Sequence, residues 1–238
     1  MQERYLGDIH DFFKFLFLKN LSRALGCKIG LNWYLVNPED LGQNEIKKND
    51  GEKRYFLDKE TYSQYDKKLI EELSFYKNLE KRNIIQFSNT THLKDYIKFY
   101  KIHIKQNFRK TWLKDSLKYF KDEKIIFLDP DNGVSWNFKG KKSIKYVTPE
   151  DIKFMTEDNK VIIFTQFQSF TKTTTNHIKN ILDELRKYNL KFLLPVVRNR
   201  TAPNTFFITI GNKELSTQIS SFYKDYQKKY KEVELITL

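Results

Sequence analysis

Short runs of consecutive apolar residues recur along this chain, and each run ends at polar or turn-forming residues. The clearest are IIFL at 125–128, VIIF at 161–164 and FLLPVV at 192–197. An unbroken apolar run is typical of a strand that is covered on both faces of a sheet. Segments with helical periodicity separate these runs, and such alternation favours a parallel sheet. The sequence therefore predicts an α/β fold with a mostly parallel sheet between helices.

Apolar residues at helical spacing predict the helices. Residues 9–25 read as a helix with one buried stripe, and Gly26 is a suitable residue to end it. Thr148 is a candidate cap for a helix that begins at Pro149. Further helices are expected at 62–76, over most of 91–121 in two pieces, at 177–188 with Asn176 as a candidate cap, and at 213–230.

The expected strands are 28–36, 83–87, 124–129, 160–167, 191–197 and 205–210, with a short strand at 54–57. Only RNRTAPN separates the last two of the long strands, which is too short for a parallel crossover and predicts an antiparallel C-terminal hairpin. Residues 38–60 are polar and interrupt the pattern. We expect them to be an insertion in a single α/β domain that spans residues 1–238.

The composition is strongly basic and aromatic. The net charge is +13, and the chain contains 14 Tyr and 20 Phe. Lysines neutralise phosphates and aromatic rings stack on bases, so nucleic acid is the expected partner. A chain rich in Lys, Asn, Ile, Phe and Tyr is also typical of an AT-rich genome, which leaves the charge open to a neutral explanation.

No apolar run approaches the roughly 20 residues that a membrane-spanning helix needs. Gln2, Glu3 and Arg4 are polar or charged and lead directly into an amphipathic pattern, unlike a signal peptide. Cys27 is the single cysteine and forms no intrachain disulfide. These features predict a cytoplasmic protein without a membrane partner.

A cluster of polar residues follows the apolar run 125–128: Asp129, Pro130, Asp131 and Asn132, and then Gly133. Ligands of open α/β sheets bind beyond the carboxyl ends of the strands, so Asp129 is a candidate site residue. The same residues also make a good turn, because proline presets φ, Asp and Asn bond their own backbone, and glycine accepts positive φ. Both interpretations stay open at this point.

Two motifs and the order of the elements resemble one family. The stretch YLGDIHDFFK places Gly7, Asp8, Asp11 and Lys14 around the start of the first helix, and LKYFKDEKIIFLDPDNG places Asp129 and Pro130 after a buried strand. This arrangement resembles the large-subunit ribosomal RNA adenine methyltransferases with an Asp-Pro-Pro-Tyr motif. The likeness covers nearly the whole chain in order and spacing.

The resemblance implies a Rossmann-like class I methyltransferase fold and a function as an S-adenosylmethionine-dependent enzyme acting on adenine in nucleic acid. It implies that Asp129, Pro130, Asp131 and Asn132 form the catalytic segment. The residues that it assigns to the cofactor are Gly7, Asp8, Asp11 and Lys14. His10, between Asp8 and Lys14, and Asn37, in the loop after the first strand, are further candidates for this site, although His10 is equally explained as a helix-surface histidine without a function. Lys14 could equally pair with Asp11 as a simple i,i+3 contact on the helix.

This sequence departs from the family pattern at two places. The second proline and the tyrosine of the motif are Asp131 and Asn132, so the aromatic face normally offered to the base is missing, and Trp136 is a candidate substitute. The loop after the first strand reads WYLVNPED, without the glycine-rich turn that lets the backbone approach the cofactor.

Basic residues cluster in two segments that would flank the same cleft. The candidates for contact with nucleic acid are Lys141, Lys142, Lys145 and Tyr146 in one segment, and Arg198 and Arg200 in the hairpin loop. Lysine and arginine can bind phosphates. The alternative is a solvated, mobile surface loop.

Two other functions remain open. Asp129 and Asp131, with Asp8 or Asp11, could hold Mg²⁺ in a metal-dependent nuclease or phosphodiesterase. The chain could instead be a non-catalytic nucleic-acid-binding module on a methyltransferase-like fold, including one that serves in a defence system. The four histidines lack metal-ligand spacing, so we expect no zinc site.

Overall fold

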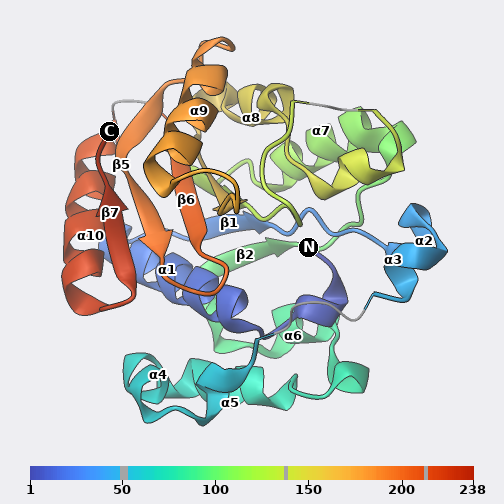
Figure 1. Ribbon diagram of the computed structural model, residues 1–238, viewed down its shortest axis with the longest axis vertical. Coiled ribbons are helices and arrows are strands. Elements are labelled where there is room, and N and C mark those ends of the chain that lie inside the picture. Colours follow the sequence, from blue (N-terminus) through green and yellow to red (C-terminus); the bar gives the residue numbers. More distant parts are fainter. Residues whose placement is uncertain (49–52, 137–138, 212–213) are drawn as a thin grey trace.

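In the residues that the computed structural model describes, 1–48, 53–136, 139–211 and 214–238, a seven-stranded sheet forms the middle layer (Figure 1). The strand order is β2-β1-β3-β4-β6-β5-β7. The first four strands are mutually parallel, and the pairs β4–β6, β6–β5 and β5–β7 are antiparallel. The strands are β1 (Ile29–Asn32), β2 (Ile97–Tyr100), β3 (Ile125–Leu128), β4 (Val161–Phe167), β5 (Phe192–Asn199), β6 (Thr205–Ile210) and β7 (Val233–Ile236).

Helices cover both faces of the sheet (Figure 1). One layer contains α1 (Ile9–Leu25), α4 (Glu60–Tyr65), α5 (Lys67–Phe75), α6 (Ile84–Thr90) and α10 (Ser216–Lys229). The other contains α7 (Arg109–Tyr119), α8 (Pro149–Met155) and α9 (Thr174–Arg186). Two short helices, α2 (Pro38–Leu41) and α3 (Gln43–Ile46), lie in the predicted insertion. The α/β class and the antiparallel C-terminal hairpin are confirmed, and the arrangement is compatible with a Rossmann-like fold.

Alternate residues of the central strands serve two separate cores. Ile125 and Phe127 of β3 pack with α1, whereas Ile126 and Leu128 pack beneath α7, α8 and α9. Successive side chains of a strand point to opposite faces of the sheet. A strand between two helical layers must therefore be apolar at every position, which is the physical reason for the unbroken apolar runs.

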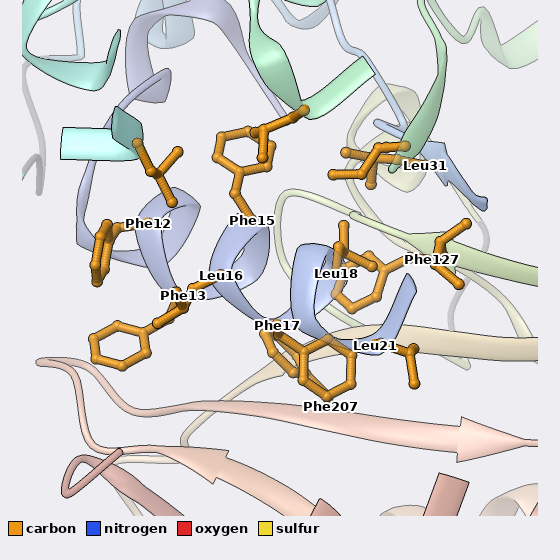
Figure 2. Packing of buried hydrophobic residues seen from close by; sticks show 14 of the residues in the cluster. Phe12, Phe13, Phe15, Leu16, Phe17, Leu18, Leu21, Leu31, Phe127 and Phe207 are labelled. Atoms are coloured by element: carbon orange, nitrogen blue, oxygen red, sulfur yellow. The ribbon is translucent and has the colours of Figure 1, made fainter. Parts of the chain in front are cut away.

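Helix α1 is buried around most of its circumference, so the prediction of a single buried stripe is wrong. Figure 2 shows its phenylalanines pointing in several directions. Phe17 contacts Phe207 of β6, with ring centroids 4.8 Å apart, while Phe15 contacts Phe87 of α6 at 5.0 Å. Helices α4 to α6 cover the side of α1 that the sheet leaves open, and the polar residues Asp11 and Lys14 are buried with the rest.

Three predicted elements in the first half of the chain are wrong. The expected strand 83–87 lies in α6, whose first turn is capped by the Asn83 side chain. The expected helix 91–121 contains strand β2, and only α7 is a full helix there. The expected strand 54–57 is largely a 3₁₀ helix, η2 (Tyr55–Asp58). Short apolar runs do not distinguish strands from buried helices, which explains these errors.

Other boundaries differ more modestly. The helix expected at 62–76 breaks at Asp66, which caps α5, and Thr173 rather than Asn176 caps α9. Strand β1 ends at Asn32 instead of 36, and β7 was not predicted. The bounds of α1, its end at left-handed Gly26 and Thr148 as the cap of α8 are confirmed, and Asp151 completes a capping box there. The described part of the chain has no helix both long and apolar enough to cross a bilayer.

Candidate functional site

A pocket of about 220 Å³ lies at the carboxyl ends of β3 and β4, beside the first turns of α1. Its wall is built from residues far apart in the sequence. They are Met1, Tyr5, Asp8, His10, Asp11, Lys14, Lys48, Asp129, Pro130, Asp131, Asn132, Lys145, Thr165, Phe167, Pro203, Thr205 and Phe207. This is the sheet edge where α/β folds bind ligands.

The first turn of α1 is held in place by its own carboxylates. Asp8 caps the helix, and its Oδ1 accepts from the backbone N–H groups of His10 and Asp11, both at 2.9 Å. Asp11 Oδ2 accepts from the backbone N–H of Gly7 at 2.8 Å. Gly7 has φ +79°, and an added Cβ would lie 3.0 Å from an Arg54 guanidinium nitrogen. Gly7 therefore shapes the start of the helix.

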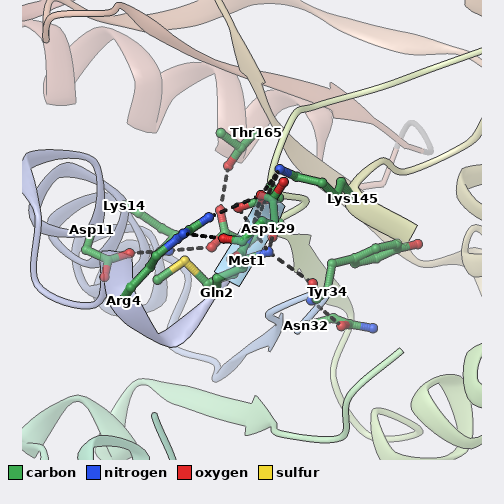
Figure 3. A network of polar contacts seen from close by, with 12 residues as sticks. Met1, Gln2, Arg4, Asp11, Lys14, Asn32, Tyr34, Asp129, Lys145 and Thr165 are labelled. Carbon is green, nitrogen blue, oxygen red and sulfur yellow. Dashed lines mark hydrogen bonds and ion pairs between the residues drawn. The ribbon is translucent and has the colours of Figure 1, made fainter. Parts of the chain in front are cut away.

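Lys14 joins α1 to the end of β3 (Figure 3). Its ammonium donates to Asp11 Oδ1 and to Asp129 Oδ2, each at 2.5 Å, and its side chain is only 4% exposed. Asp129 Oδ1 also accepts from the Thr165 hydroxyl at 3.2 Å. Burial opposes the charge on Lys14, but the two carboxylates outweigh it and raise the pKa of its ammonium. The contact keeps Lys14 charged and fixes the orientation of Asp129.

Three titratable groups beside Lys14 have shifted pKa values. Burial raises the pKa of Asp8 to about 6, against the lowering effect of its backbone hydrogen bonds and of Lys14. Burial also raises the pKa of Asp11 to about 6. The pKa of His10 falls to about 4, chiefly because its ring is buried. Clustered shifts of this kind are typical of functional sites in a cleft, although structural networks also produce them.

A second buried lysine lines the same pocket. Lys145 contacts Glu45 at 2.7 Å and Asp131 at 3.0 Å. The Gln2 amide donates to both carboxylates, at 3.0 Å and 2.8 Å. Burial works against the charge on Glu45, yet the hydrogen bonds from Lys145 and Gln2 prevail and lower its pKa to about 2. Two lysines, each between two carboxylates, thus tie the site together.

The backbone beyond β1 turns through a left-handed residue. Tyr34 has φ 45°, which is uncommon for a residue other than glycine. The side chain of Asn32 accepts from the Tyr34 N–H at 3.0 Å and supports this turn. The carbonyls of Tyr34 and Asp129 both accept from the amino group of Met1, at 3.0 and 3.3 Å. The turn therefore presents backbone acceptors at the position where the resemblance implies a glycine-rich loop.

The segment after Asp129 is both a turn and a wall of the pocket. Gly133 has φ +83°, and an added Cβ would lie 2.3 Å from Gln166 Oε1. That oxygen accepts from the Val134 N–H at 2.9 Å. Asp129, Pro130, Asp131 and Asn132 all line the pocket. The same segment therefore forms the turn after β3 and part of the pocket wall.

The structure brings together most of the predicted site residues, but not all of them. Among the candidates for the cofactor site, Asp8, His10, Asp11 and Lys14 line the pocket, whereas Gly7 does not. Asn37 caps α2 by accepting from the Glu39 N–H and does not reach the pocket. Trp136 packs against the core beneath α8 and α9, so it does not supply an aromatic face there.

The residues predicted to contact nucleic acid occupy different environments. Lys141 and Lys142 are exposed on η6 (Lys141–Lys145), while Lys145 is buried in the pocket. The Tyr146 carbonyl accepts from Arg109 at 2.7 Å. Arg198 lies within β5 rather than in the hairpin loop and pairs with Glu234 at 2.8 Å, and Arg200 donates to the Lys231 carbonyl. Their contact with nucleic acid stays a prediction, and Lys145 as placed does not face the surface.

Several residues of the pocket were not predicted. Thr165 and Phe167 come from the carboxyl end of β4, and Phe167 meets the His10 ring edge-on at 5.7 Å. The rule that singled out Asp129 after β3 applies equally to the end of β4 and could have found both. Glu45, which does not line the pocket but pairs with Lys145, comes from the polar insertion, where no sequence pattern distinguishes it from its neighbours.

The described residues contain no group of three or more His, Cys, Asp or Glu side chains that could hold a metal ion. Comparison with protein-family models, with curated proteins and with solved structures finds no match to this chain. The function therefore has to be argued from the pocket itself.

Proposed function

We propose that this protein transfers a methyl group from S-adenosylmethionine to the exocyclic amine of adenine in nucleic acid. The supporting observation is the convergence of Asp129, at the end of β3, with Asp11 and Lys14 of α1 in one buried network. The two motifs on which the sequence resemblance rests lie more than a hundred residues apart, yet they contact each other directly.

The acceptors in the pocket fit the amino-acid part of this cofactor. We expect the amino group of the cofactor to be accepted by the Tyr34 and Asp129 carbonyls, which accept from the amino group of Met1 in this structure. Asp8 and Asp11 lie in the same wall and can accept hydroxyl hydrogens. The pocket of about 220 Å³ is below the roughly 300 Å³ typical of small-molecule sites, so binding requires Met1 to leave.

Bound S-adenosylmethionine supplies an electrophilic methyl group, and the chain's own residues orient the acceptor. The Asp129 carboxylate and the Pro130 carbonyl accept the two amine hydrogens and turn the nitrogen lone pair toward the methyl group. Lys14 is a positioning residue, because it holds the Asp129 carboxylate at 2.5 Å. Phe167 offers an aromatic ring in the same pocket. Such positioning accounts for most of the rate effect in a reaction that needs little acid–base help.

The same contacts weigh against the metal-dependent nuclease. Asp129 is paired with Lys14 and Asp131 with Lys145, so an ammonium group already lies where Mg²⁺ would bind each carboxylate. A cation at either position would be repelled by the lysine beside it. Methyl transfer uses Asp129 as a fixed hydrogen-bond acceptor and is compatible with the pairing.

The test combines calorimetry with S-adenosylmethionine and transfer of a labelled methyl group to single-stranded poly(A), with poly(U) as the acceptor control. We expect one-to-one binding and transfer to poly(A) alone. Asp129→Asn keeps the backbone carbonyl but weakens the acceptor, so transfer falls about 100-fold or more, whereas Asp122→Asn, at an exposed position, leaves it unchanged. No binding to the wild type, or nucleic-acid cleavage that needs Mg²⁺ or Mn²⁺, would refute the proposal.

A further inference from the structure

A second and larger hollow lies on the other side of η6. Its volume is about 770 Å³, and its walls come from η5 (Gln106–Phe108), α7, η6 and α8. Ser143 lines this groove, whereas Lys145, two residues further along η6, lines the first pocket. One short segment therefore separates the two cavities.

The walls of the groove are held rigidly by Arg109. Its guanidinium donates to the Ser143 and Tyr146 carbonyls, at 3.2 and 2.7 Å, and forms an ion pair with Asp151 of α8. The three walls α7, η6 and α8 are thus joined through one side chain. The charge of Arg109 is neutralised by Asp151, so the groove needs other cations to attract an anion.

Those cations come from α7 and η6. Lys110 and Lys114 line the groove and are exposed on successive turns of α7, and within the described residues neither forms an ion pair. Lys141 and Lys142 are exposed on η6, which contacts η5. Glu150 also lines the groove, on the α8 side, and its carboxylate would repel phosphates. The attractive path therefore runs between α7 and η6, away from α8.

An exposed aromatic residue, Phe108 of η5, lies in the sequence between Asn107 and Arg109, which both line the groove. Phe108 is 63% exposed and makes no ring contact in the part of the chain that the structure describes. The preceding Asn107 lines the groove and offers an amide. Exposed rings beside lysines are how proteins bind single strands, because unpaired bases stack on the ring while phosphates follow the cations.

We propose that the groove between α7 and η6 binds single-stranded nucleic acid, with Lys110 and Lys114 on phosphates and Phe108 stacked on a base. This inference rests on the proposed function for its partner and adds the path by which the strand reaches the first pocket. RNA and DNA single strands share the chemistry that the groove recognises, and the experiment separates them.

The experiment measures fluorescence anisotropy of labelled 20-nucleotide RNA, DNA and duplex DNA against salt concentration, without S-adenosylmethionine. The variant Lys110→Ala/Lys114→Ala is compared with Lys224→Ala/Lys228→Ala, which removes two exposed lysines at the same spacing from α10, on the opposite face of the sheet. For single strands we expect the α7 variant to bind about 10-fold more weakly and the negative slope of log K against log salt to become shallower by about 1.4. Phe108→Ala should weaken binding roughly 5-fold or more.

An α7 variant that binds like the α10 control, or a wild type that prefers the duplex, would overturn the inference. Single-strand binding that the α7 substitutions weaken supports the groove, and the tighter-bound of RNA and DNA then identifies the kind of strand. Groove-dependent binding without methyl transfer would refute only the proposed function. Methyl transfer that survives the α7 substitutions with unchanged binding would refute only the groove.

Discussion

At the scale of single residues, the pocket depends on lysines that each neutralise two carboxylates. Lys14 contacts Asp11 and Asp129, and Lys145 contacts Glu45 and Asp131. A buried ion pair adds little stability over an apolar pair, but removing one partner leaves a buried charge without compensation. The main effect of these contacts is therefore to hold the carboxylates in place, and they add little to the stability of the fold.

Removing the Lys14 charge should destabilise the protein strongly. Lys14→Met leaves Asp11 and Asp129 buried without their counter-ion, and breaking a buried pair in this way typically costs about 3–5 kcal/mol. Lys228→Met removes an ammonium that is 79% exposed and pairs with Asp225, which should change the free energy of unfolding by less than about 1 kcal/mol. Urea unfolding of both variants measures the difference. Equal effects would mean that Lys14 is solvated rather than buried.

Asp8 should make stability depend on pH in an unusual direction. Its pKa is about 6 in the folded protein against an ordinary value of 3.8, so the folded protein keeps a proton that the unfolded chain has released. By linkage, the stability that this group contributes is present at low pH and is lost as pH rises through that window. Asp8→Asn removes the ionisation while keeping a good helix cap.

The measurement is the difference in unfolding free energy between wild type and Asp8→Asn at several pH values. We expect the wild type to lose stability relative to the variant between pH 3.8 and about 6, and the difference to be level above that. Asp11 and His10 titrate in both proteins, so their contributions largely cancel. A wild type that gains relative stability over this range would show that Asp8 is held charged.

At the scale of elements, the sequence was most informative where a pattern has one physical cause. The apolar runs predicted β3 and β4, because a strand buried on two faces must be apolar throughout. Thr148 and Pro149 predicted the start of α8, because the first turn of a helix needs a side-chain cap and tolerates proline. The run at 83–87 failed, because a short apolar segment fits a strand and a buried helix equally well, and only packing against Phe15 distinguishes them.

The residues of the candidate site also fall into two groups, those that a sequence pattern indicates and those that it does not. Asp129 was predicted because the end of a buried strand can be recognised in the sequence, and Lys14 because the start of the first helix resembles the cofactor-binding motif of the methyltransferase family. Glu45 could not be predicted, because its contact with Lys145 joins residues a hundred positions apart and no motif contains it. The turn at Tyr34 could not be predicted from the sequence either, because its left-handed φ depends on the Asn32 side chain rather than on a glycine.

The turn after β3 can be tested with two glycines that share one backbone conformation. Gly133 and Gly140 have φ +83° and +82°, so alanine is strained at both. At Gly133 the new Cβ would also lie 2.3 Å from Gln166 Oε1, whereas at Gly140 no atom of the described residues lies within 4 Å of it. We expect Gly133→Ala to cost about 1–3 kcal/mol more than Gly140→Ala in thermal or urea unfolding. Similar losses would show that Gln166 moves aside and that the turn is not tightly packed.

At the scale of the whole molecule, the two cores share the strands that separate them. Ile163 of β4 belongs to the core beneath α1, and Ile162 and Phe164 belong to the core beneath α7, α8 and α9. Neither helical layer can leave without exposing one face of the same strands to water, which would remove much of the stabilisation of the sheet. The single domain predicted for residues 1–238 should therefore unfold as one unit, although it is larger than most two-state proteins.

Two tryptophans report on the two cores separately. Trp33 is fully buried in the core with α1, and Trp112, which is 4% exposed, lies in the core with α7. Trp33→Phe with Trp136→Phe leaves Trp112 as the reporter, and Trp112→Phe with Trp136→Phe leaves Trp33. Within each variant, urea transitions followed by fluorescence and by far-ultraviolet circular dichroism should coincide, because coincident probes are the mark of one cooperative transition. Fluorescence of either tryptophan that changes at a lower urea concentration than the dichroism would show that its helical layer separates first, and the chain would then contain two folding units that meet at the sheet.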